Sequence, residues 1–354
     1  MKNFLILSLA GFILWSCGGT SDLAYQVNSP DDQISITFMT IGGKAAYTVS
    51  YKGSTQIDTS YLGFEFKDQP SLTENLSIKN QSLTTVDETW EMVWGEQREV
   101  RNNYNELRLT LQENKAPNRT FDVVFKAYND GIGFRYEFPE QAALSDEVVI
   151  TEEMTQFNLT GDHKVWWIPG DWDIYEYLYT ESKFSKINAY DQFIPGDHLG
   201  QVYLHSNSVN TPVTMKSDEG VYLSFHEADL TDYAGMTLKV DTSDLSMVSE
   251  LVGNDAGIKV KTQAPFVTPW RTIQIADRAE NLLESNLIVN LNDPNELGDI
   301  EWFKPMKYIG IWWDMHLNRR TWDYASGNHG ATTAYTKELI DFAAENDMGG
   351  VLVE

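Results

Sequence analysis

The densest run of aromatic and acidic side chains in the sequence spans residues 165–179 and has Tyr175-Glu176-Tyr177 near its end. A carboxylate among aromatic rings can ligate a hard cation, or it can accept hydrogen bonds from sugar hydroxyls. Alternation of side chains along an extended segment predicts that Glu176 points away from the two flanking tyrosines. The same pattern also fits a solvated strand face beside a packed cluster, so both interpretations stay open.

Two more polar groups of residues occur in the middle of the chain. Asp197, His198 and Leu199 lie between two glycines. Such glycines let the backbone approach a ligand closely, while aspartate and histidine offer hydrogen bonds of both signs. A turn with a solvated histidine is the alternative. His226 and Glu227 end a predicted strand, and there a buried ion pair is the simplest interpretation.

A continuous apolar run at Tyr308–Trp313 predicts a strand that is covered on both faces. Trp313, Asp314 and His316 stand at its carboxyl end, and Glu354 holds the equivalent position after a second such run. Active sites of α/β folds gather at the carboxyl ends of parallel strands. Trp313 and Glu354 are therefore candidates for substrate binding.

The composition excludes several classes of function. The 354 residues include 52 acidic and 26 basic ones, a formal net charge of −26. A field of that sign repels phosphate backbones and anionic membrane surfaces, so nucleic acid is not an expected partner. Aromatic residues make up 12% of the chain, which suits sugars as ligands or a large aromatic-packed β core. The sequence lacks the motifs of serine hydrolases, P-loop kinases, dinucleotide enzymes and zincins.

Residues 1–22 have the pattern of an export signal followed by a linker. Lys2 precedes the apolar run Phe4–Trp15, which is shorter than a standard membrane-spanning helix. The sequence Leu14-Trp15-Ser16-Cys17 resembles a bacterial lipobox, which predicts a lipid anchor on Cys17 and a periplasmic, membrane-anchored lipoprotein. An ordinary signal peptide with an incidental cysteine is the alternative. Because there is one cysteine, no intrachain disulfide can form.

Residues 23–297 alternate apolar and polar side chains in many short runs, of which Ile132–Phe138 is one. Period two predicts strands with one face in a core. Asn129-Asp130-Gly131 before that run is a strong hairpin signal. We therefore expect a mainly β domain, a sandwich or another large antiparallel two-sheet structure. A short helix is expected at Asp277–Ser285, and the apolar run Asn286–Leu291 is expected to be a strand that the following proline ends.

After about residue 297 the pattern changes to continuous apolar runs. Tyr308–Trp313 and residues 350–354 predict buried strands, and a helix that Thr332 or Thr333 caps is predicted between them. A single β-α-β unit cannot close a parallel sheet or cover both of its faces. Residues 298–354 are therefore expected to open a larger α/β domain whose remainder is missing from this sequence. The alternative is that both strands extend an edge of the sandwich.

The order of these motifs resembles glycoside hydrolase family 97. The resemblance runs from about residue 24 to residue 354 and rests on five stretches: Trp166-Trp167-Ile168-Pro169, Tyr175-Glu176-Tyr177, Asp197-His198-Leu199-Gly200, Ser224-Phe225-His226-Glu227-Ala228 and Tyr308–Glu354. The family includes α-glucosidases of bacterial starch-utilisation systems and some α-galactosidases. Its plan is an N-terminal β-super-sandwich, a central (β/α)8 barrel and a small C-terminal β domain. The resemblance thus implies an antiparallel β-super-sandwich at 23–297 and the first β-α-β of an incomplete barrel at 298–354.

The resemblance also implies site residues. The family's calcium is held mostly by barrel glutamates and by one glutamate of the sandwich, which falls on Glu176, although Glu181 is close enough to be confused with it. Asp197, His198 and Leu199 fall in a loop that reaches into the substrate pocket. Glu354 resembles a carboxylate that contacts a sugar hydroxyl.

Family members divide into inverting and retaining enzymes, and the resemblance places all their catalytic carboxyls beyond residue 354. The implied protein is the N-terminal portion of an exported, calcium-dependent glycosidase that hydrolyses α-glucosidic or α-galactosidic bonds of oligosaccharides. The alternative from another class is a non-catalytic carbohydrate-binding lipoprotein whose sugar platform is residues 165–179. A structural surface domain is a third possibility.

Overall fold

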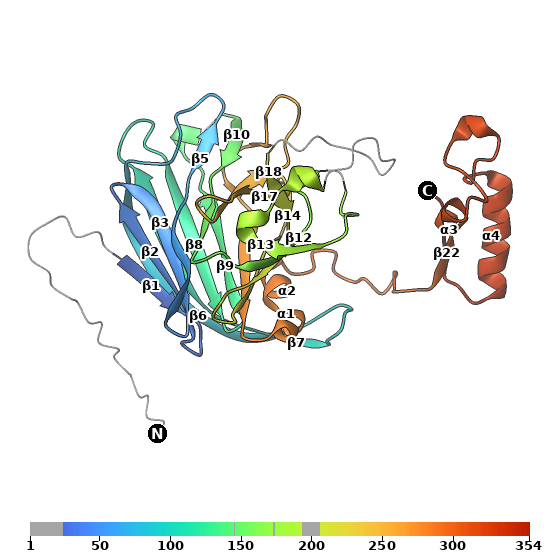
Figure 1. Ribbon diagram of the computed structural model, residues 1–354, viewed down its shortest axis with the longest axis horizontal. Helices are drawn as coiled ribbons and strands as arrows, with labels where there is room; N and C mark the ends of the chain where they lie inside the picture. Colours follow the sequence, from blue (N-terminus) through green and yellow to red (C-terminus); the bar gives the residue numbers. More distant parts are fainter. Residues whose placement is uncertain (1–23, 145, 173, 193–205) are drawn as a thin grey trace, which may run out of the picture. The chain divides into compact units, whose positions relative to one another are not determined.

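The computed structural model describes residues 24–354 apart from 145, 173 and 193–205 (Figure 1). The chain divides into two compact units. The sandwich unit comprises Met1–Glu91 and Glu99–Asp293, and the C-terminal unit comprises Met92–Arg98 and Pro294–Glu354. Each unit is described separately below. Within the described residues, no helix is both long enough and apolar enough to span a membrane.

The first large sheet of the sandwich unit has eight strands, all paired antiparallel. In spatial order they are β1 (Ala24–Asn28), β2 (Ile34–Ile41), β3 (Lys44–Tyr51), β4 (Ser54–Tyr61), β11 (Gln156–Leu159), β18 (Ser246–Leu251), β17 (Met236–Asp241) and β14 (Ser208–Asn210).

The second large sheet is also antiparallel. Its order is β13 (Thr180–Lys183), β12 (Lys164–Trp167), β15 (Val213–Lys216), β16 (Tyr222–Ala228), β21 (Trp270–Ala276), β9 (Gly131–Phe138), β8 (Thr120–Tyr128), β7 (Glu99–Glu113) and β6 (Leu76–Glu91), and β20 (Phe266–Val267) also pairs with β9. A small third sheet holds β19 (Val260–Thr262), β10 (Val148–Glu153) and β5 (Phe64–Phe66).

Aromatic rings from both large sheets fill the space between them. Phe38 of β2 and Phe125 of β8 have ring centroids 6.0 Å apart, and Tyr47 of β3 and Phe134 of β9 are 5.0 Å apart. All four side chains are fully buried. The predicted antiparallel sandwich is therefore confirmed, and the aromatic content of this part of the chain serves its core.

The predicted hairpin at Asn129-Asp130-Gly131 joins β8 to β9, with Tyr128 paired to Gly131. Glycine is required at position 131 because an added Cβ atom would lie 2.4 Å from the carbonyl oxygen of Ile273 on the neighbouring β21. The hairpin turn and the close approach of β21 thus both favour glycine at position 131.

The two helices after β21 correct one prediction. Helix α1 (Ala279–Glu284) falls inside the expected helical stretch, but the apolar run after it is not a strand: it forms α2 (Leu287–Leu291). The two leucines stand four residues apart, which places them on one helical face. There they cover β9, where a Cβ atom on Gly133 would lie 2.5 Å from Leu291. The short 3₁₀ helices of this unit are η1 (Ala142–Leu144), η2 (Phe184–Lys186) and η3 (Ala189–Asp191).

The C-terminal unit contains a parallel pair of strands with helices between them. Strands β22 (Tyr308–Gly310) and β23 (Gly350–Leu352) form a two-stranded sheet of their own. Between them lie α3 (Trp312–His316), η4 (Tyr324–Ser326) and α4 (Thr333–Glu345). The predicted cap of α4 is confirmed, because the Thr332 hydroxyl accepts a hydrogen bond from the Tyr335 N–H at 3.3 Å.

The prediction of a strand at Tyr308–Trp313 is correct only for its first half. The strand ends at Gly310, and α3 begins at Trp312. Ile311 is buried, whereas Trp313 is 68% exposed. A continuous apolar run cannot distinguish a buried strand from a strand that gives way to a short helix. The parallel pair and its connecting helix are present, while their membership of a barrel remains a prediction.

Candidate functional site

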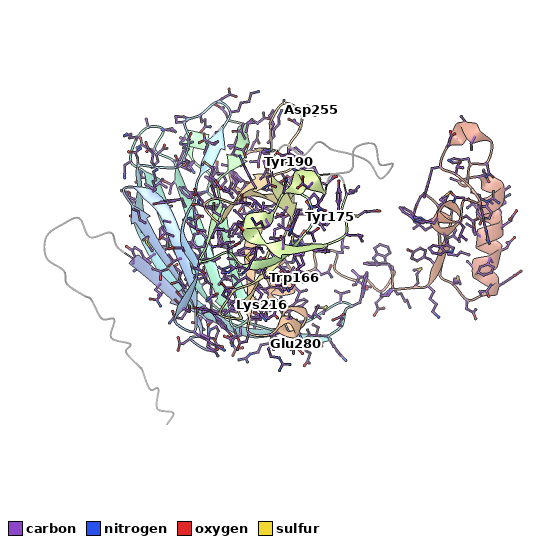
Figure 2. All side chains as sticks on the ribbon, in the orientation of Figure 1. Trp166, Tyr175, Tyr190, Lys216, Asp255 and Glu280 are labelled. Atoms are coloured by element: carbon purple, nitrogen blue, oxygen red, sulfur yellow. The ribbon has the colours of Figure 1, made fainter. Side chains whose placement is uncertain are left out.

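The structure describes only some of the residues that the sequence singled out. Asp197, His198, Leu199 and Cys17 lie outside the described residues. Glu176 is described and its side chain is exposed. The segment that carries it, residues 174–179, lies between β12 and β13 without being a strand itself. Figure 2 marks Tyr175 in this segment and Trp166 on the preceding strand.

The chain reaches this segment along β14. After β12, Pro169 pairs with Val209 in an isolated bridge, and the Gly170 N–H donates to the Ser208 carbonyl at 2.8 Å. A Cβ atom on Gly170 would lie 2.3 Å from the Ser208 hydroxyl oxygen, so this close path requires glycine. The entry to the segment is therefore fixed by backbone pairing.

Side chains hold the segment itself. Asp171 is buried, and its two carboxylate oxygens accept hydrogen bonds from the Ile174 N–H at 3.3 Å and from the Tyr177 hydroxyl at 2.9 Å. The Asn210 side-chain amide donates to the Ile174 carbonyl at 3.3 Å. The segment is thus anchored although no strand pairs with it.

Glu176, on which the resemblance places the metal ligand, and the nearby Glu181 differ in their surroundings. Glu181 on β13 forms an ion pair with Lys164 at 2.6 Å and accepts a hydrogen bond from the Trp166 ring N–H at 3.0 Å. The hydrogen bond from Lys164 lowers the pKa of the Glu181 carboxyl. Glu176 has no hydrogen bond or ion pair to any described residue. Of the two carboxylates, Glu176 is the one whose oxygens are available to a ligand.

The pair at His226 and Glu227 does not form the ion pair that the sequence suggested. Glu227 binds Arg271 instead, at 2.6 Å. The His226 Nδ1 lies 3.0 Å from the Thr211 hydroxyl oxygen, and burial lowers the pKa of His226. His226 and Glu227 do not pair with each other because successive residues of a strand point to opposite faces of its sheet.

Sequence reasoning missed the rest of this buried network. Arg271 makes two hydrogen bonds to Glu153, both at 2.7 Å, and all three charged side chains are buried. The Tyr233 hydroxyl donates to Glu153 at 3.0 Å. The arginine and Glu153 are 118 residues apart in the chain, so no local motif announces the pair. Its position inside the sandwich unit assigns it to the core rather than to a ligand.

In the C-terminal unit, Trp313 and Glu354 both follow the ends of the parallel strands, where Gly310 pairs with Leu352. Both side chains are exposed. Asp314 accepts a hydrogen bond from the Tyr335 hydroxyl and lies 3.6 Å from Arg320. Asp314 is therefore engaged in the structure of the unit itself.

The described part of the chain contains no group of three or more His, Cys, Asp or Glu side chains that could hold a metal ion. Calcium takes six to eight oxygen ligands. An exposed, unpaired carboxylate is a suitable donor to such an ion, so Glu176 fits the part of one ligand among several. Any further ligands of such an ion would have to come from outside the described residues.

Comparison with known proteins identifies the family. The sequence model described as Glycosyl-hydrolase 97 N-terminal matches residues 27–294. The chain belongs to glycoside hydrolase family 97. The match covers the sandwich unit almost from end to end and agrees with the resemblance drawn from the motifs.

Relatives within family 97 are about twice as long as this chain. The retaining alpha-galactosidase of Bacteroides thetaiotaomicron is 26% identical over 377 aligned residues, which cover all of this chain and 53% of that protein. A family 97 enzyme from Pseudoalteromonas sp. strain K8, solved with acarbose, is 39% identical with a TM-score of 0.80 and is matched over 93% of this chain and 47% of its own.

A variant of the Pseudoalteromonas enzyme was solved with panose and matches equally well. A beta-arabinopyranosidase is 20% identical with a TM-score of 0.72, which supports the fold alone. The chain thus spans about half the length of the relatives it matches.

Proposed function

We propose that this chain is the sandwich half of an exported, calcium-dependent glycosidase that hydrolyses α-linked oligosaccharides. In this proposal the sandwich lies against the active site and contributes one metal ligand, Glu176. The observation that carries the assignment of the ligand is the contrast between the two candidate glutamates, since Glu181 is paired with Lys164 and Glu176 has no partner among the residues that the structure describes. The family match supports the class of reaction.

The substrate class is supported by what the relatives bind. The Pseudoalteromonas enzyme holds acarbose, and its variant holds panose, both of which are oligosaccharides. The Bacteroides relative is an alpha-galactosidase at lower identity. We therefore propose α-glucosidic bonds as the first substrate to test and α-galactosidic bonds as the second.

We place the catalytic pair of carboxyls in the half that the relatives have in addition to the matched region. A separation of about 5–5.5 Å between two such carboxyls supports a retaining mechanism, and about 6.5–9.5 Å an inverting one. When bound, calcium would supply positive charge that holds sugar hydroxyls and stabilises negative charge on reacting oxygens. Glu176 would hold the ion from the sandwich side.

We also propose that the mature protein is a lipoprotein anchored through Cys17 in the periplasm. The support is the lipobox-like sequence before that cysteine. Metabolic labelling with a fatty acid tests it: the wild-type protein is expected to take up label, and Cys17→Ala is not. A labelled Cys17→Ala protein would contradict the anchor.

The activity is tested on the complete gene product with aryl α-glucoside and aryl α-galactoside. We expect hydrolysis of at least one of them. The activity should be lost after addition of a calcium chelator and should return when Ca²⁺ is added in excess over the chelator. An active enzyme that the chelator does not affect would refute the role of calcium. A complete gene product that binds oligosaccharides but hydrolyses neither substrate would favour the binding lipoprotein.

A further inference from the structure

The segment at residues 174–179 carries Glu176 without the support of a strand ladder. Exposed loops of this kind are ordinarily mobile, and a metal ligand on a mobile loop has to be ordered at the moment of binding. Something in this chain has to hold the segment if Glu176 is to act as a preformed ligand. The contacts of the segment show what that is.

We infer that Asp171 is a positioning residue, whose buried carboxylate holds the segment so that Glu176 presents its own carboxylate outward. The identity of the ion rests on the proposed function, whereas the anchoring of the segment does not. Asp171 itself is buried and is not offered as a ligand.

Two hydrogen bonds to Asp171 come from residues on either side of Glu176 in the sequence. One carboxylate oxygen binds the N–H of Ile174, two residues before Glu176, at 3.3 Å. The other binds the hydroxyl of Tyr177, one residue after it, at 2.9 Å. One side chain thereby closes a short loop with Glu176 inside it. Hydrogen bonds to an ionised acceptor are stronger than neutral ones, and burial shields them from water.

A second anchor comes from a different element. Asn210 is the last residue of β14, it is buried, and its side-chain amide donates to the Ile174 carbonyl at 3.3 Å. Its own backbone N–H donates to the Ile168 carbonyl at 3.1 Å. Both polar groups of the Ile174 backbone are therefore held, the N–H by Asp171 and the carbonyl by Asn210.

Apart from a side-chain hydrogen bond between Tyr175 and Thr211, the described residues make no such contact with the outward face of the segment. Leu178 is 90% exposed, and Tyr175 and Tyr179 are each more than half exposed. Hydrogen bonds thus hold the segment on its buried side, and its other side is exposed to solvent. This division fits an element that presents a ligand to a neighbouring part of the enzyme, and Asp171 supplies the fixed side of it.

Hydrogen exchange on the 354-residue chain tests the anchoring without any metal or substrate. In Asp171→Ala and in Tyr177→Phe, we expect the amides of residues 174–178 to exchange faster, by about tenfold in the former and less in the latter. Exchange in β12 and β15 should stay unchanged. Tyr177→Phe keeps the buried carboxylate, so it remains informative if Asp171→Ala does not fold.

Asp162→Ala is the matched control. Asp162 also accepts hydrogen bonds from one backbone N–H and one hydroxyl, both of Ser185 and both at 2.8 Å. Its removal should speed exchange at Ser185 and leave residues 174–178 as they are. If Asp171→Ala and Tyr177→Phe leave exchange in the segment unchanged, the anchoring is refuted.

The link to Glu176 is tested by a double-mutant cycle on the complete gene product, with the half-saturating Ca²⁺ concentration as the readout. We expect Asp171→Ala to raise that concentration about tenfold in the wild-type background. In the Glu176→Gln background the same change should have little further effect, because the carboxylate that Asp171 positions is no longer present. Asp162→Ala should raise it in neither background.

The outcomes separate the two proposals. A tenfold rise that persists in the Glu176→Gln background would show that Asp171 acts by another route and would overturn the positioning role. A wild-type enzyme that needs no calcium would refute the proposed metal, and the exchange experiment would then decide the anchoring by itself.

Discussion

The sandwich unit and the C-terminal unit differ in how they bury their large side chains. In the sandwich unit, rings such as those of Phe125 and Phe134 are fully buried between two sheets. The C-terminal unit buries a small cluster around Leu339, while Trp302 and Tyr324 are 76% and 87% exposed. A unit with its rings inside has a core of its own, whereas one with its rings outside has little to stabilise it.

Buried charges follow the same division. In the sandwich unit, the enclosed Arg271 forms ion pairs with both Glu153 and Glu227. The C-terminal unit pairs Asp314 with Arg320 at 3.6 Å, and neither residue is fully buried. Removing one partner of an enclosed network leaves another buried charge uncompensated, which strongly destabilises the fold. The comparison therefore predicts that the two units respond differently to substitution.

The largest effect is expected from Arg271→Ala in the sandwich unit. It leaves two buried carboxylates without their cation, which should lower the free energy of unfolding by about 3–5 kcal/mol. Urea denaturation followed by tryptophan fluorescence measures this. Arg278→Ala is the control, because Arg278 and Glu280 form an exposed pair and its loss should leave the midpoint where it is. An Arg271→Ala protein as stable as wild type would show that the network is not holding the sheets.

Truncating one core residue in each unit sharpens the comparison. Phe125→Ala should lower the free energy of unfolding of the sandwich unit by about 3–5 kcal/mol. Leu339→Ala should speed amide exchange in α4 and β23 and leave the sandwich transition unchanged. If Leu339→Ala lowers that transition as well, the two units unfold as one block and the division is wrong.

A smaller effect is expected at the β8–β9 turn. Gly131→Ala would place a Cβ atom against the Ile273 carbonyl and 2.9 Å from Leu287, which should cost about 2 kcal/mol of stability. Gly220→Ala, at a positive φ with open space around it, should cost about 1 kcal/mol. Thermal denaturation compares the two. Equal costs would mean that crowding by β21 and α2 is relieved by movement.

The smallest effect is a pH dependence from His226. Burial holds the pKa of its folded form below the value near 6.5 that it has when unfolded, so the unfolded state binds the proton more readily. Stability should therefore fall as the pH drops from about 7 toward the lowered pKa of the folded state. His226→Asn should flatten this slope, because asparagine does not titrate in this range. An unchanged slope in urea titrations at several pH values would contradict the assignment.

The sequence predicts the sandwich well because its signals are local. Alternation at Ile132–Phe138 and the turn residues at 129–131 suffice to place β9 and its hairpin. The errors at 286–291 and 308–313 arise where a short apolar run fits either a strand or a helix, and tertiary packing decides. Leu287 and Leu291 become helical because the glycines of β9 leave room for them.

The candidate site could be predicted only in part. The resemblance places the metal ligand at Glu176, but the sequence does not show that Glu181 is paired, because the lysine that pairs with Glu181 lies on a neighbouring strand. The second anchor of the segment is hidden for the same reason. Asn210 meets Ile174 across 36 residues, and only the folded sheet brings them together.

The role of Glu176 can be tested by a calcium titration of the complete gene product and two matched variants, Glu176→Gln and Glu181→Gln, with hydrolysis of an aryl α-glycoside as the readout. We expect Glu176→Gln to raise the half-saturating calcium concentration by about tenfold or more and Glu181→Gln to leave it unchanged. The opposite ranking, or equal values for both variants and the wild type, would contradict the claim that this sandwich gives Glu176 to the metal.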